Sequence, residues 1–461
     1  MIADFRFARF RDHMLMTNDA GRFVFLTPDE FDLFIHDRLA HDSALWQNLH
    51  DRFFCYEGSR EVYLRSIQDA VRNNHAYLFT PTSLFIFALT NRCNNRCIYC
   101  QAQGNTSARD MTPSVAEKII ERIAESGIRQ ISIEFQGGEP LLNFAAIRQI
   151  VSSAETLLKD RAFDFSLVSN LSYMNDELAD FIEEHHISVS TSLDGPRMLH
   201  DLNRPTADHR SSYDLMLRGL ELLHRRGISV GGIQTTTRAS LPYAKEIVQI
   251  YRALGMNAVF LRPLTRLGAA AKAWDTIGYT AEEFLRFYQE GLTEIIRINK
   301  EGILFSESHA AIFLAKLLGE AAPNYMELRS PCGAGIGQLA FTANGDVFTC
   351  DEGRMVAETG DMLFKLGNVY ENGYNDWMNS STCKAVCSSS LLETLPTCCD
   401  CVYQPYCGVC PVVNYCLEGS LRPQAPNNDR CKVYKGIIEI LMNYFLNQDS
   451  QTIDVFRKWI Y

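Results

Sequence analysis

The stretch Cys93-Asn-Asn-Arg-Cys97-Ile-Tyr-Cys100 indicates more about the fold than any other part of the sequence. Its three thiols have the spacing CxxxCxxC and directly follow an apolar run, residues 84–90, that has the pattern of a β-strand. Three thiolates from one loop can converge on a single [4Fe-4S] cluster and leave one iron without a protein ligand. The alternative is a structural zinc site, which also uses CxxC pairs.

Short apolar runs alternate with longer amphipathic runs from residue 83 to about residue 263. This alternation predicts a parallel sheet made of right-handed βαβ units. Functional residues of such folds lie at the carboxyl ends of the strands. The expected strands are 84–90, 130–135, 163–168, 187–193, 228–236 and 258–263, and the expected helices are 113–126, 143–159, 175–185, 211–226 and 241–254.

Polar motifs follow three more of the expected strands. Gly137-Gly138-Glu139-Pro140 ends the second strand, Ser169-Asn170 ends the third, and Ser192-Leu-Asp194-Gly-Pro ends the fourth. Two glycines let a backbone approach a ligand closely, and a glutamate supplies an acceptor for a cation such as an ammonium group. Arg204 completes the pattern SxDGPxxxHDxxR, for which a surface ion pair with Asp201 is the alternative.

The composition argues against several classes of protein. The 461 residues, 46% hydrophobic and 21% charged, suit a multidomain globular chain. A net charge of -11 and the lack of a basic run argue against a nucleic-acid partner. No apolar stretch has the length of a membrane span and the N-terminus lacks an apolar signal core, so we expect a cytoplasmic protein with no membrane partner.

Cysteine is unusually frequent, with 15 residues in the chain. Disulfides are rare in a reducing cytosol, so clustered cysteines are first interpreted as ligands. From about residue 331 the regular periodicity fades and Cys, Gly and Pro become frequent, which indicates a segment held by metals more than by a core. For Cys398 and Cys401 with Cys407 and Cys410, a zinc ribbon is the alternative.

Together these motifs resemble the radical S-adenosylmethionine (SAM) superfamily, whose signature is CxxxCxxC after the first strand of a partial (β/α)6 barrel and GGEP after the second. The resemblance implies that Cys93, Cys97 and Cys100 bind the [4Fe-4S] cluster that reductively cleaves SAM. The residues that it implies for binding SAM are Gly137, Gly138, Glu139, Pro140, Ser169, Asn170, Ser192, Asp194 and Arg204.

The C-terminal cysteines resemble a SPASM domain, which holds auxiliary [4Fe-4S] clusters in peptide-maturing members. By position, the first cluster would take Cys332, Cys350 and Cys410, and the second Cys398, Cys401, Cys407 and Cys431. Cys407 and Cys410 are separated by two residues where three are usual, so the fourth ligand of the first cluster stays open, and the chain holds one or two auxiliary clusters. The surplus cysteines are Cys383, Cys387, Cys399 and Cys416.

Asp351 directly follows Cys350. In the sulfatase-maturing relatives an aspartate at that position is the proposed base, so the resemblance implies a catalytic role for Asp351. A plain exposed carboxylate is the alternative.

The expected fold is therefore α/β, a partial (β/α)6 radical SAM barrel with a small N-terminal α+β module and a C-terminal Cys-rich SPASM domain. Three short strands and three helices in the N-terminal module have the outline of a winged-helix element that recognises a peptide, and a structural cap on the barrel is the alternative. The expected segments are 1–82 for this module, 83–300 for the barrel, 301–330 for a connector, 331–431 for the SPASM domain and 432–461 for C-terminal helices.

The resemblance implies a radical SAM enzyme that modifies a ribosomally made peptide or a protein and takes electrons from a donor such as ferredoxin or flavodoxin. Residues 5–30 and the string CVYQPYCGVCPVVNYC at 401–416 are similar to the His-Xaa-Ser system maturases, which implies a peptide rich in His-Xaa-Ser repeats. One alternative is an anaerobic sulfatase-type maturase that forms formylglycine. Another is a non-catalytic, zinc-stabilised scaffold that presents a peptide.

Overall fold

The computed structural model describes residues 1–102, 109–319, 323–425 and 428–460. Its main feature is a sheet of ten strands in the order β10-β9-β8-β7-β6-β5-β4-β11-β12-β13. The neighbours from β10 to β11 are parallel, whereas β12 and β13 are antiparallel. The α/β fold class predicted from the sequence is confirmed.

Strands β4 to β9 are the six strands predicted from the apolar runs. Their bounds are Leu84–Ala88, Gln130–Gln136, Ala162–Val168, Ser188–Ser192, Val230–Thr235 and Ala258–Arg262. Strand β5 has one buried apolar face and one partly buried polar face. Ile131, Ile133 and Phe135 are buried, whereas the alternating Ser132, Glu134 and Gln136 are only partly buried and belong to the other face.

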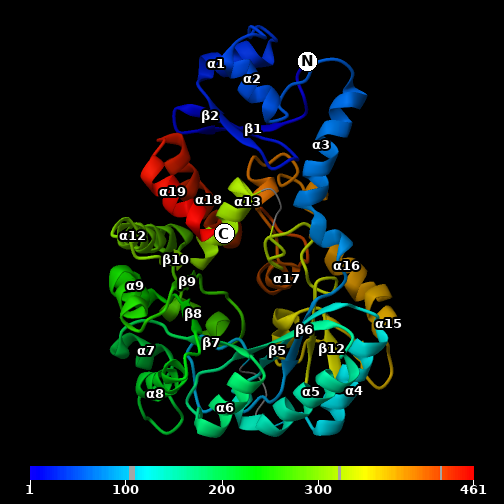
Figure 1. The fold of residues 1–461 in the computed structure, drawn as a ribbon, viewed down its shortest axis with the longest axis vertical. Coiled ribbons are helices and arrows are strands. Elements are labelled where there is room, and N and C mark those ends of the chain that lie inside the picture. The colour runs from blue at the N-terminus through cyan, green and yellow to red at the C-terminus, as the bar shows by residue number, and fades with distance from the viewer. Residues whose placement is uncertain (103–108, 320–322, 426–427, 461) are drawn as a thin grey trace.

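Helices connect these strands and lie on the outer side of the sheet (Figure 1). The five that were predicted are α4 (Pro113–Glu125), α5 (Phe144–Leu157), α6 (Asp176–Glu184), α8 (Ser212–Arg225) and α9 (Ala244–Ala253). Three of them begin with a side chain that caps a backbone N–H, namely Thr112, Asn175 and Ser211. The further helices in this region are α7 (Arg197–Asn203), α10 (Gly268–Lys272), α11 (Trp274–Ile277) and α12 (Ala281–Lys300).

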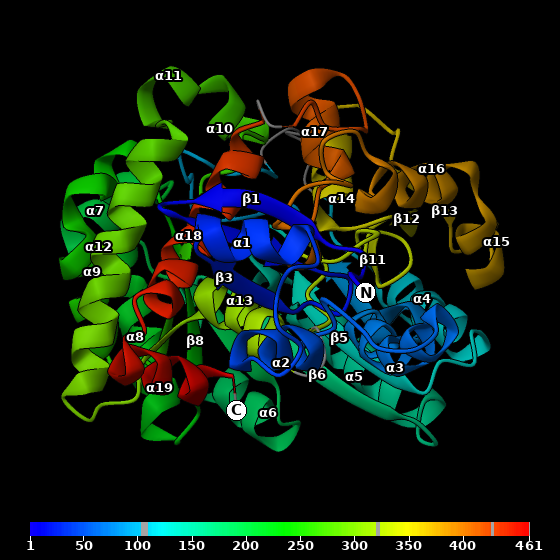
Figure 2. The same ribbon diagram turned by 90° about the horizontal axis from the view of Figure 1, so that it is seen from above.

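The N-terminal module has the predicted three strands and three helices. Its strands β1 (Arg6–Phe10), β2 (His13–Thr17) and β3 (Phe23–Leu26) form an antiparallel meander, followed by α1 (Pro28–Ile35), α2 (Ala44–Asp51) and α3 (Arg60–Asn74). Seen from above, β1 and β3 lie over the C-terminal helices (Figure 2), and Phe23 packs against Phe445. Thr17 Oγ1 donates to the carbonyl of Val402, which ties the module to the cysteine-rich segment.

Residues 301–330, expected as a connector, contain β10 (Ser306–Glu307) and α13 (Ser308–Leu318). The segment after residue 331 is also more regular than its composition indicates. It contains β11 (Gln338–Phe341), β12 (Asp346–Phe348), β13 (Lys365–Asn368), α14 (Asp351–Ala357), α15 (Tyr374–Asn379), α16 (Ser381–Ser389) and α17 (Pro411–Glu418). The sequence hides these elements because they are short, and because every residue of β11 and β12 is buried, which removes the alternation of a half-buried strand.

Two helices end the chain, as predicted, namely α18 (Asp429–Leu446) and α19 (Ser450–Trp459). Both pack on α12 and α13. Short 3-10 turns lie at 76–79, 140–143, 238–243, 392–394 and 404–406. No helix in the described part of the chain is both long enough and apolar enough to cross a membrane.

Glu307 joins the edge of the sheet to α12 and α13. Its carboxylate is completely buried, accepts hydrogen bonds from Leu261 N–H and Ala310 N–H at 3.1 and 2.5 Å, and accepts one from Tyr288 Oη at 2.5 Å. Burial raises the pKa of Glu307 to about 7, and these hydrogen bonds lower it only in part.

We predict that the free energy of unfolding falls as pH rises from about 4.5 to about 7, because the unfolded chain releases the Glu307 proton at a lower pH than the folded chain. The slope from this group is at most about 1.4 kcal/mol per pH unit. Urea unfolding of the Glu307→Gln variant should lack this slope, so the difference from wild type should be larger at pH 5 than at pH 8. The exposed Glu290→Gln variant is the control, and a pH-independent difference for Glu307→Gln contradicts the prediction.

Candidate active site

A cavity of about 1300 Å³ lies at the carboxyl ends of the parallel strands. Its wall combines the loop after β4, the ends of β5 to β9, and two segments of the C-terminal third, residues 324–327 and 351–355. Parallel strands place their carboxyl ends on one edge, which is why motifs far apart in the sequence meet here.

Cys93, Cys97 and Cys100 all line this cavity, so the structure brings together the three thiols of the CxxxCxxC motif. Backbone hydrogen bonds fix their loop: Cys100 N–H donates to the Cys97 carbonyl at 3.1 Å, and Ala269 N–H donates to the Cys100 carbonyl at 2.9 Å. Burial is the main reason that the pKa of Cys93 is raised to about 11 and that of Cys97 to about 12, and the neighbouring Cys100 acts in the same direction on both. A bound cation or cluster would favour the thiolate forms that burial opposes.

No three His, Cys, Asp or Glu side chains among the described residues are close enough together to hold a single metal ion. A [4Fe-4S] cluster makes a different demand, because each thiolate binds a different iron and the thiols are correspondingly farther apart. Three thiols on one loop at the wall of a large cavity fit that demand.

The GGEP motif is joined to the cysteine loop. Gly138 N–H donates to the Thr90 carbonyl at 2.7 Å, and Glu139 N–H donates to the Arg92 carbonyl at 2.8 Å. A Cβ atom at Gly138 would lie 2.2 Å from the Arg92 oxygen. Gly138 therefore lets the cysteine loop approach closely, whereas we predicted from the sequence that the glycines let a ligand approach.

Glu139 lies deep in the wall of the cavity. Ser169 Oγ and Leu141 N–H donate to one carboxylate oxygen at 2.7 and 3.1 Å, and Asn170 N–H donates to the other at 2.8 Å. Burial raises the pKa of Glu139, and these hydrogen bonds act in the opposite direction. The residues Ser169 and Asn170 thus orient the carboxylate toward the cavity that they also line.

Arg204 contributes a buried positive charge beside the cysteines. Its Nη1 donates to Tyr99 Oη at 2.7 Å, and Tyr99 Oη donates to Asp194 Oδ2 at 2.7 Å. Arg204 Nε has no hydrogen-bond partner among the described residues, although it is buried and the side chain lines the cavity. An unpaired guanidinium N–H at the wall fits an anionic ligand group such as a carboxylate.

The structure places seven of the nine predicted SAM residues on the wall of the cavity, namely Gly137, Gly138, Glu139, Ser169, Asn170, Ser192 and Arg204. Pro140 begins a buried 3-10 turn behind the wall. Asp194 is fully buried behind Tyr99 and also accepts a hydrogen bond from Thr235 N–H at 3.3 Å. Its position suits the support of Tyr99 and Arg204 more than contact with a ligand.

The seven C-terminal cysteines assigned by resemblance lie in two groups. Cys332, Cys350 and Cys410 are buried in one apolar cluster with Phe348 and Val412. Burial raises the pKa of Cys350, and Cys410 and Cys332 raise it further. In the second group, burial and, to a smaller extent, neighbouring thiols raise the pKa of Cys407 to about 12. Those neighbours are Cys431, Cys401 and Cys398.

Two of the surplus cysteines adjoin these groups, because Cys332 raises the pKa of Cys387 and Cys399 raises that of Cys398. Cys383 and Cys387 are one turn apart on α16, and the hydrogen bond between their thiols lowers the pKa of Cys383. Cys416 is exposed on α17. The carbonyl of Cys399 accepts a hydrogen bond from Arg6 Nε at 2.7 Å, which adds a second link to the N-terminal module.

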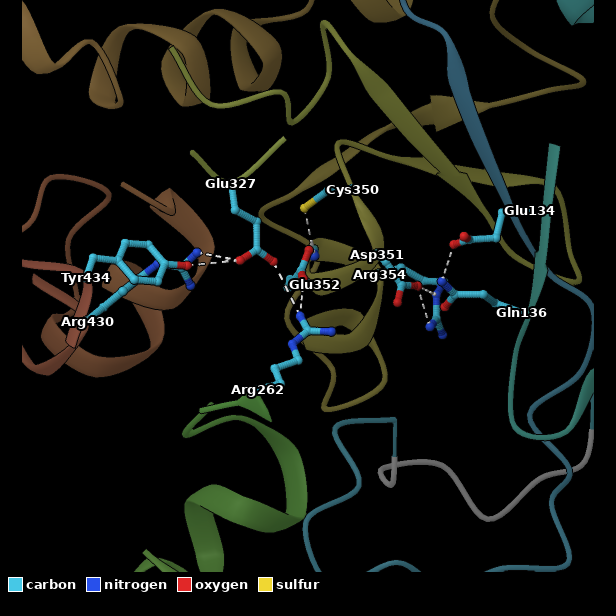
Figure 3. Close-up of polar contacts among 11 residues, drawn as sticks. Glu134, Gln136, Arg262, Glu327, Cys350, Asp351, Glu352, Arg354, Arg430 and Tyr434 are labelled. Atoms are coloured by element: carbon cyan, nitrogen blue, oxygen red, sulfur yellow. Dashed lines mark hydrogen bonds and ion pairs between the residues drawn. The ribbon is translucent and has the colours of Figure 1, made fainter. Parts of the chain in front are cut away.

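Asp351 faces the cavity but is not a free carboxylate. Arg354 Nε and Nη2 both donate to Asp351 Oδ1, at 2.8 and 2.6 Å, and both side chains are buried (Figure 3). The exposed carboxylate that was the alternative for Asp351 is therefore wrong. Glu134 and Gln136, at the end of β5, point toward this pair from the opposite wall (Figure 3).

Glu134 is a cavity residue that the sequence analysis missed. Burial raises the pKa of Glu134, and the charge of Asp351 raises it further. The signal was present as a glutamate and a glutamine at alternating positions of an otherwise apolar strand, facing away from its helix-covered side.

A buried network of charges closes the far end of the cavity. Glu327 accepts from Arg430 Nη2 at 2.6 Å and from Arg262 Nη2 at 3.4 Å, and Arg262 also lies 3.8 Å from Glu352 (Figure 3). Burial alone would raise the pKa of Glu327, but the two guanidinium groups hold it well below its usual range. The network joins β9, α14 and α18, and no spacing in the sequence indicates it.

Residues 87–259 match the model of the Radical SAM superfamily. An uncharacterized protein of Methanocaldococcus jannaschii is 33% identical over 174 residues, which are 38% of this chain and 60% of that protein. The serine-type anaerobic sulfatase-maturating enzyme of Klebsiella aerogenes is 28% identical over 198 residues, 42% of this chain and 49% of the enzyme. The chain thus spans about half the length of the curated relatives it matches.

Solved structures extend the likeness in fold over most of the chain. Native anSMEcpe with bound AdoMet superposes with a TM-score of 0.70 at 18% identity, over 82% of this chain and 100% of that one. Streptococcus suis SuiB bound to precursor peptide SuiA gives 0.55 at 16% identity, over 92% of this chain and 98% of that one. Residues 87–259 are therefore similar to the Radical SAM superfamily, in a chain whose overall fold is similar to that of anSMEcpe and SuiB.

Proposed function

We propose that this protein is a cytoplasmic radical SAM enzyme that modifies a ribosomally made peptide or a protein. One observation carries the proposal: a single cavity is lined by the three CxxxCxxC thiols, the oriented Glu139 carboxylate and the unpaired Nε of Arg204. These groups match the three parts of the expected cofactor, since thiolates bind iron, a carboxylate accepts from an ammonium and a guanidinium binds a carboxylate.

When bound, the [4Fe-4S] cluster and SAM supply an electron and the 5′-deoxyadenosyl radical that takes a hydrogen atom from the substrate. The protein's own residues bind and orient. Cys93, Cys97 and Cys100 would hold the cluster, Glu139 would accept from the amino group of SAM, and Arg204 would donate to its carboxylate. Ser192 and Asn170 line the wall between them and supply polar contacts for the rest of SAM.

The two C-terminal cysteine groups would hold one or two auxiliary clusters that exchange electrons with a donor such as ferredoxin or flavodoxin. Cys398, Cys401, Cys407 and Cys431 supply four thiols for one of them, whereas Cys332, Cys350 and Cys410 supply three. Asp351 follows Cys350 and faces the cavity, so it is positioned to accept a proton from the oxidised substrate residue. Arg354 orients its carboxylate for that role.

The likeness in fold to SuiB bound to a precursor peptide supports a peptide substrate. The N-terminal module is a suitable recognition element, because β1 is an edge strand to which an extended peptide can add. A His-Xaa-Ser repeat peptide is the specific substrate that we propose from the sequence.

A sulfatase-type maturase that oxidises Cys or Ser to formylglycine is the second candidate. It is supported by the similarity to the Klebsiella enzyme and by the buried Asp351 beside Cys350. Deoxyadenosine assays and mass spectrometry with a His-Xaa-Ser peptide and with a sulfatase-derived peptide separate the two. Modification of the first peptide alone supports our proposal, and formylglycine formation alone supports the second candidate.

Replacement of Cys97 by Ala should abolish deoxyadenosine release under dithionite, because the cluster loses one of its thiolates. Iron content after anaerobic reconstitution should fall by about four atoms per chain, as loss of one four-iron cluster requires. The exposed Cys416→Ala variant is the control. Unchanged deoxyadenosine release by Cys97→Ala contradicts the assignment, and one or two zinc atoms in place of iron would support the scaffold alternative.

Replacement of Arg204 by Lys should raise the KM for SAM about 10- to 100-fold, because an ammonium group cannot reproduce the guanidinium contacts with Tyr99 and a ligand carboxylate. The measurement is deoxyadenosine release against SAM concentration, with thermal unfolding to check the fold. Arg210→Lys, at an exposed arginine paired with Asp208, should leave the KM unchanged. An unchanged KM for Arg204→Lys would show that Nε does not contact SAM.

A further inference from the structure

A second cavity, of about 250 Å³, adjoins the first and has no part in the function proposed above. It lies between the end of β9, α13, α17 and α18. Phe260, Pro263 and Glu327 are among the residues that line both cavities. A group that extends from the large cavity past the charge network would therefore enter the small one.

The wall of the small cavity is aromatic around His309, and charged side chains line other parts of it, namely Arg262, Arg266, Glu327, Glu418, Asp429 and Arg430. His309 is 2% exposed; its ring lies 5.1 Å from that of Phe313 in a stacked arrangement and 5.3 Å from Phe260 and from Tyr434 at steep angles. Neither ring nitrogen of His309 has a hydrogen-bond partner among the described residues. Buried polar atoms are nearly always paired, so two unpaired nitrogens on a cavity wall point to a ligand that pairs them.

His309 is a neutral hydrogen-bonding group. Burial lowers the pKa of His309 to about 3, although the charge of Glu327 raises it in part, and Arg430 and Arg262 act in the same direction as burial. A neutral imidazole has one nitrogen that donates and one that accepts. The cavity thus offers a donor and an acceptor in aromatic surroundings, which suits a hydroxyl or ring N–H group on an aromatic ligand.

The charged groups that act on His309 are already paired with one another, because Arg262 and Arg430 both bind Glu327. A charged ligand would lose hydration without gaining an unpaired counter-charge, so a neutral ligand is favoured. The volume is also below the range of about 300–1000 Å³ that is typical of whole-ligand sites, and so fits one side chain.

We propose that the small cavity binds a neutral aromatic side chain that carries a hydroxyl group, as tyrosine does, next to the residue that is modified. The inference rests on the proposed function in so far as the side chain belongs to a peptide or protein substrate. His309 would be a specificity-determining residue, because its imidazole can form a hydrogen bond with the hydroxyl group, whereas a plain hydrocarbon ring offers the imidazole no hydrogen-bond partner.

The test uses p-cresol as a probe of the tyrosine side chain and toluene as its hydrocarbon match, with binding to the full-length reconstituted protein followed by ligand-detected NMR. We expect p-cresol to bind about 3- to 10-fold more tightly than toluene, as one net hydrogen bond allows. In the His309→Phe variant the ratio should fall to about one. That variant keeps an aromatic ring against Phe260, Phe313 and Tyr434, and should unfold at an equal or higher temperature because it removes an unpaired buried group.

A second variant tests whether the probes bind in the small cavity. Leu417, which lines the cavity and is 39% exposed, tolerates a larger side chain, so Leu417→Trp should weaken binding of both probes by narrowing the cavity. Met362→Trp, at a residue that is 53% exposed and outside the cavity, is the matched control and should bind as wild type does. Equal binding of the two probes to wild type, or an unchanged preference in His309→Phe, overturns the inference.

Deoxyadenosine release by wild type, measured on the same preparation, separates this inference from the proposed function. Release without selective p-cresol binding removes the inference and leaves the radical SAM proposal intact. Selective binding that depends on His309, without any release, removes the radical SAM proposal and leaves an aromatic side-chain site.

Discussion

The candidate active site depends on the close contact between two loops, the one after β4 and the one after β5. Gly138 and Glu139 donate backbone hydrogen bonds to Thr90 and Arg92, and the Arg92 carbonyl occupies the space of a side chain at residue 138. Because this contact is made by backbone atoms, it fixes both loops as one unit. It thereby sets the position of Cys93 relative to Glu139, and thus of the expected cluster site relative to the expected ammonium site.

A second constraint is the burial of charge around that unit. Burial raises the pKa of Cys93, Cys97 and Glu139, so the bare cavity disfavours the ionised forms that would bind iron and an ammonium group. Arg204 opposes this effect at all three groups, and Tyr99 and Asp194 hold Arg204 in place. A bound cofactor would therefore stabilise this site more than it would stabilise a hydrated site, because the ligand supplies the charge and the polar partners that the wall lacks.

The C-terminal third joins the cavity through the sheet. Strand β11 pairs in parallel with β4, and β12 returns antiparallel to it, so Cys350 follows a strand that is continuous with the barrel. The side chain of Cys350 caps α14 by accepting from Gly353 N–H at 3.3 Å. The first turn of that helix then presents Asp351 and Glu352 to the cavity. A region that composition alone would describe as a cysteine-rich appendage is therefore part of the cavity wall.

The sequence by itself determined the six parallel strands, the helices between them and the cysteine loop, because strand period, helix caps and motif spacing are local properties of the chain. The assignment of the C-terminal cysteines to two clusters follows from the family resemblance and stays a prediction. Only the tertiary structure decided the pairing of β11 with β4, the partners of Asp351 and Glu327, and the pocket around His309. Each of these features brings together residues that are far apart in the sequence and share no local pattern. Whether a charge is buried and paired, or an imidazole is unpaired, depends on its neighbours in space, and no short-range signal in the sequence encodes them.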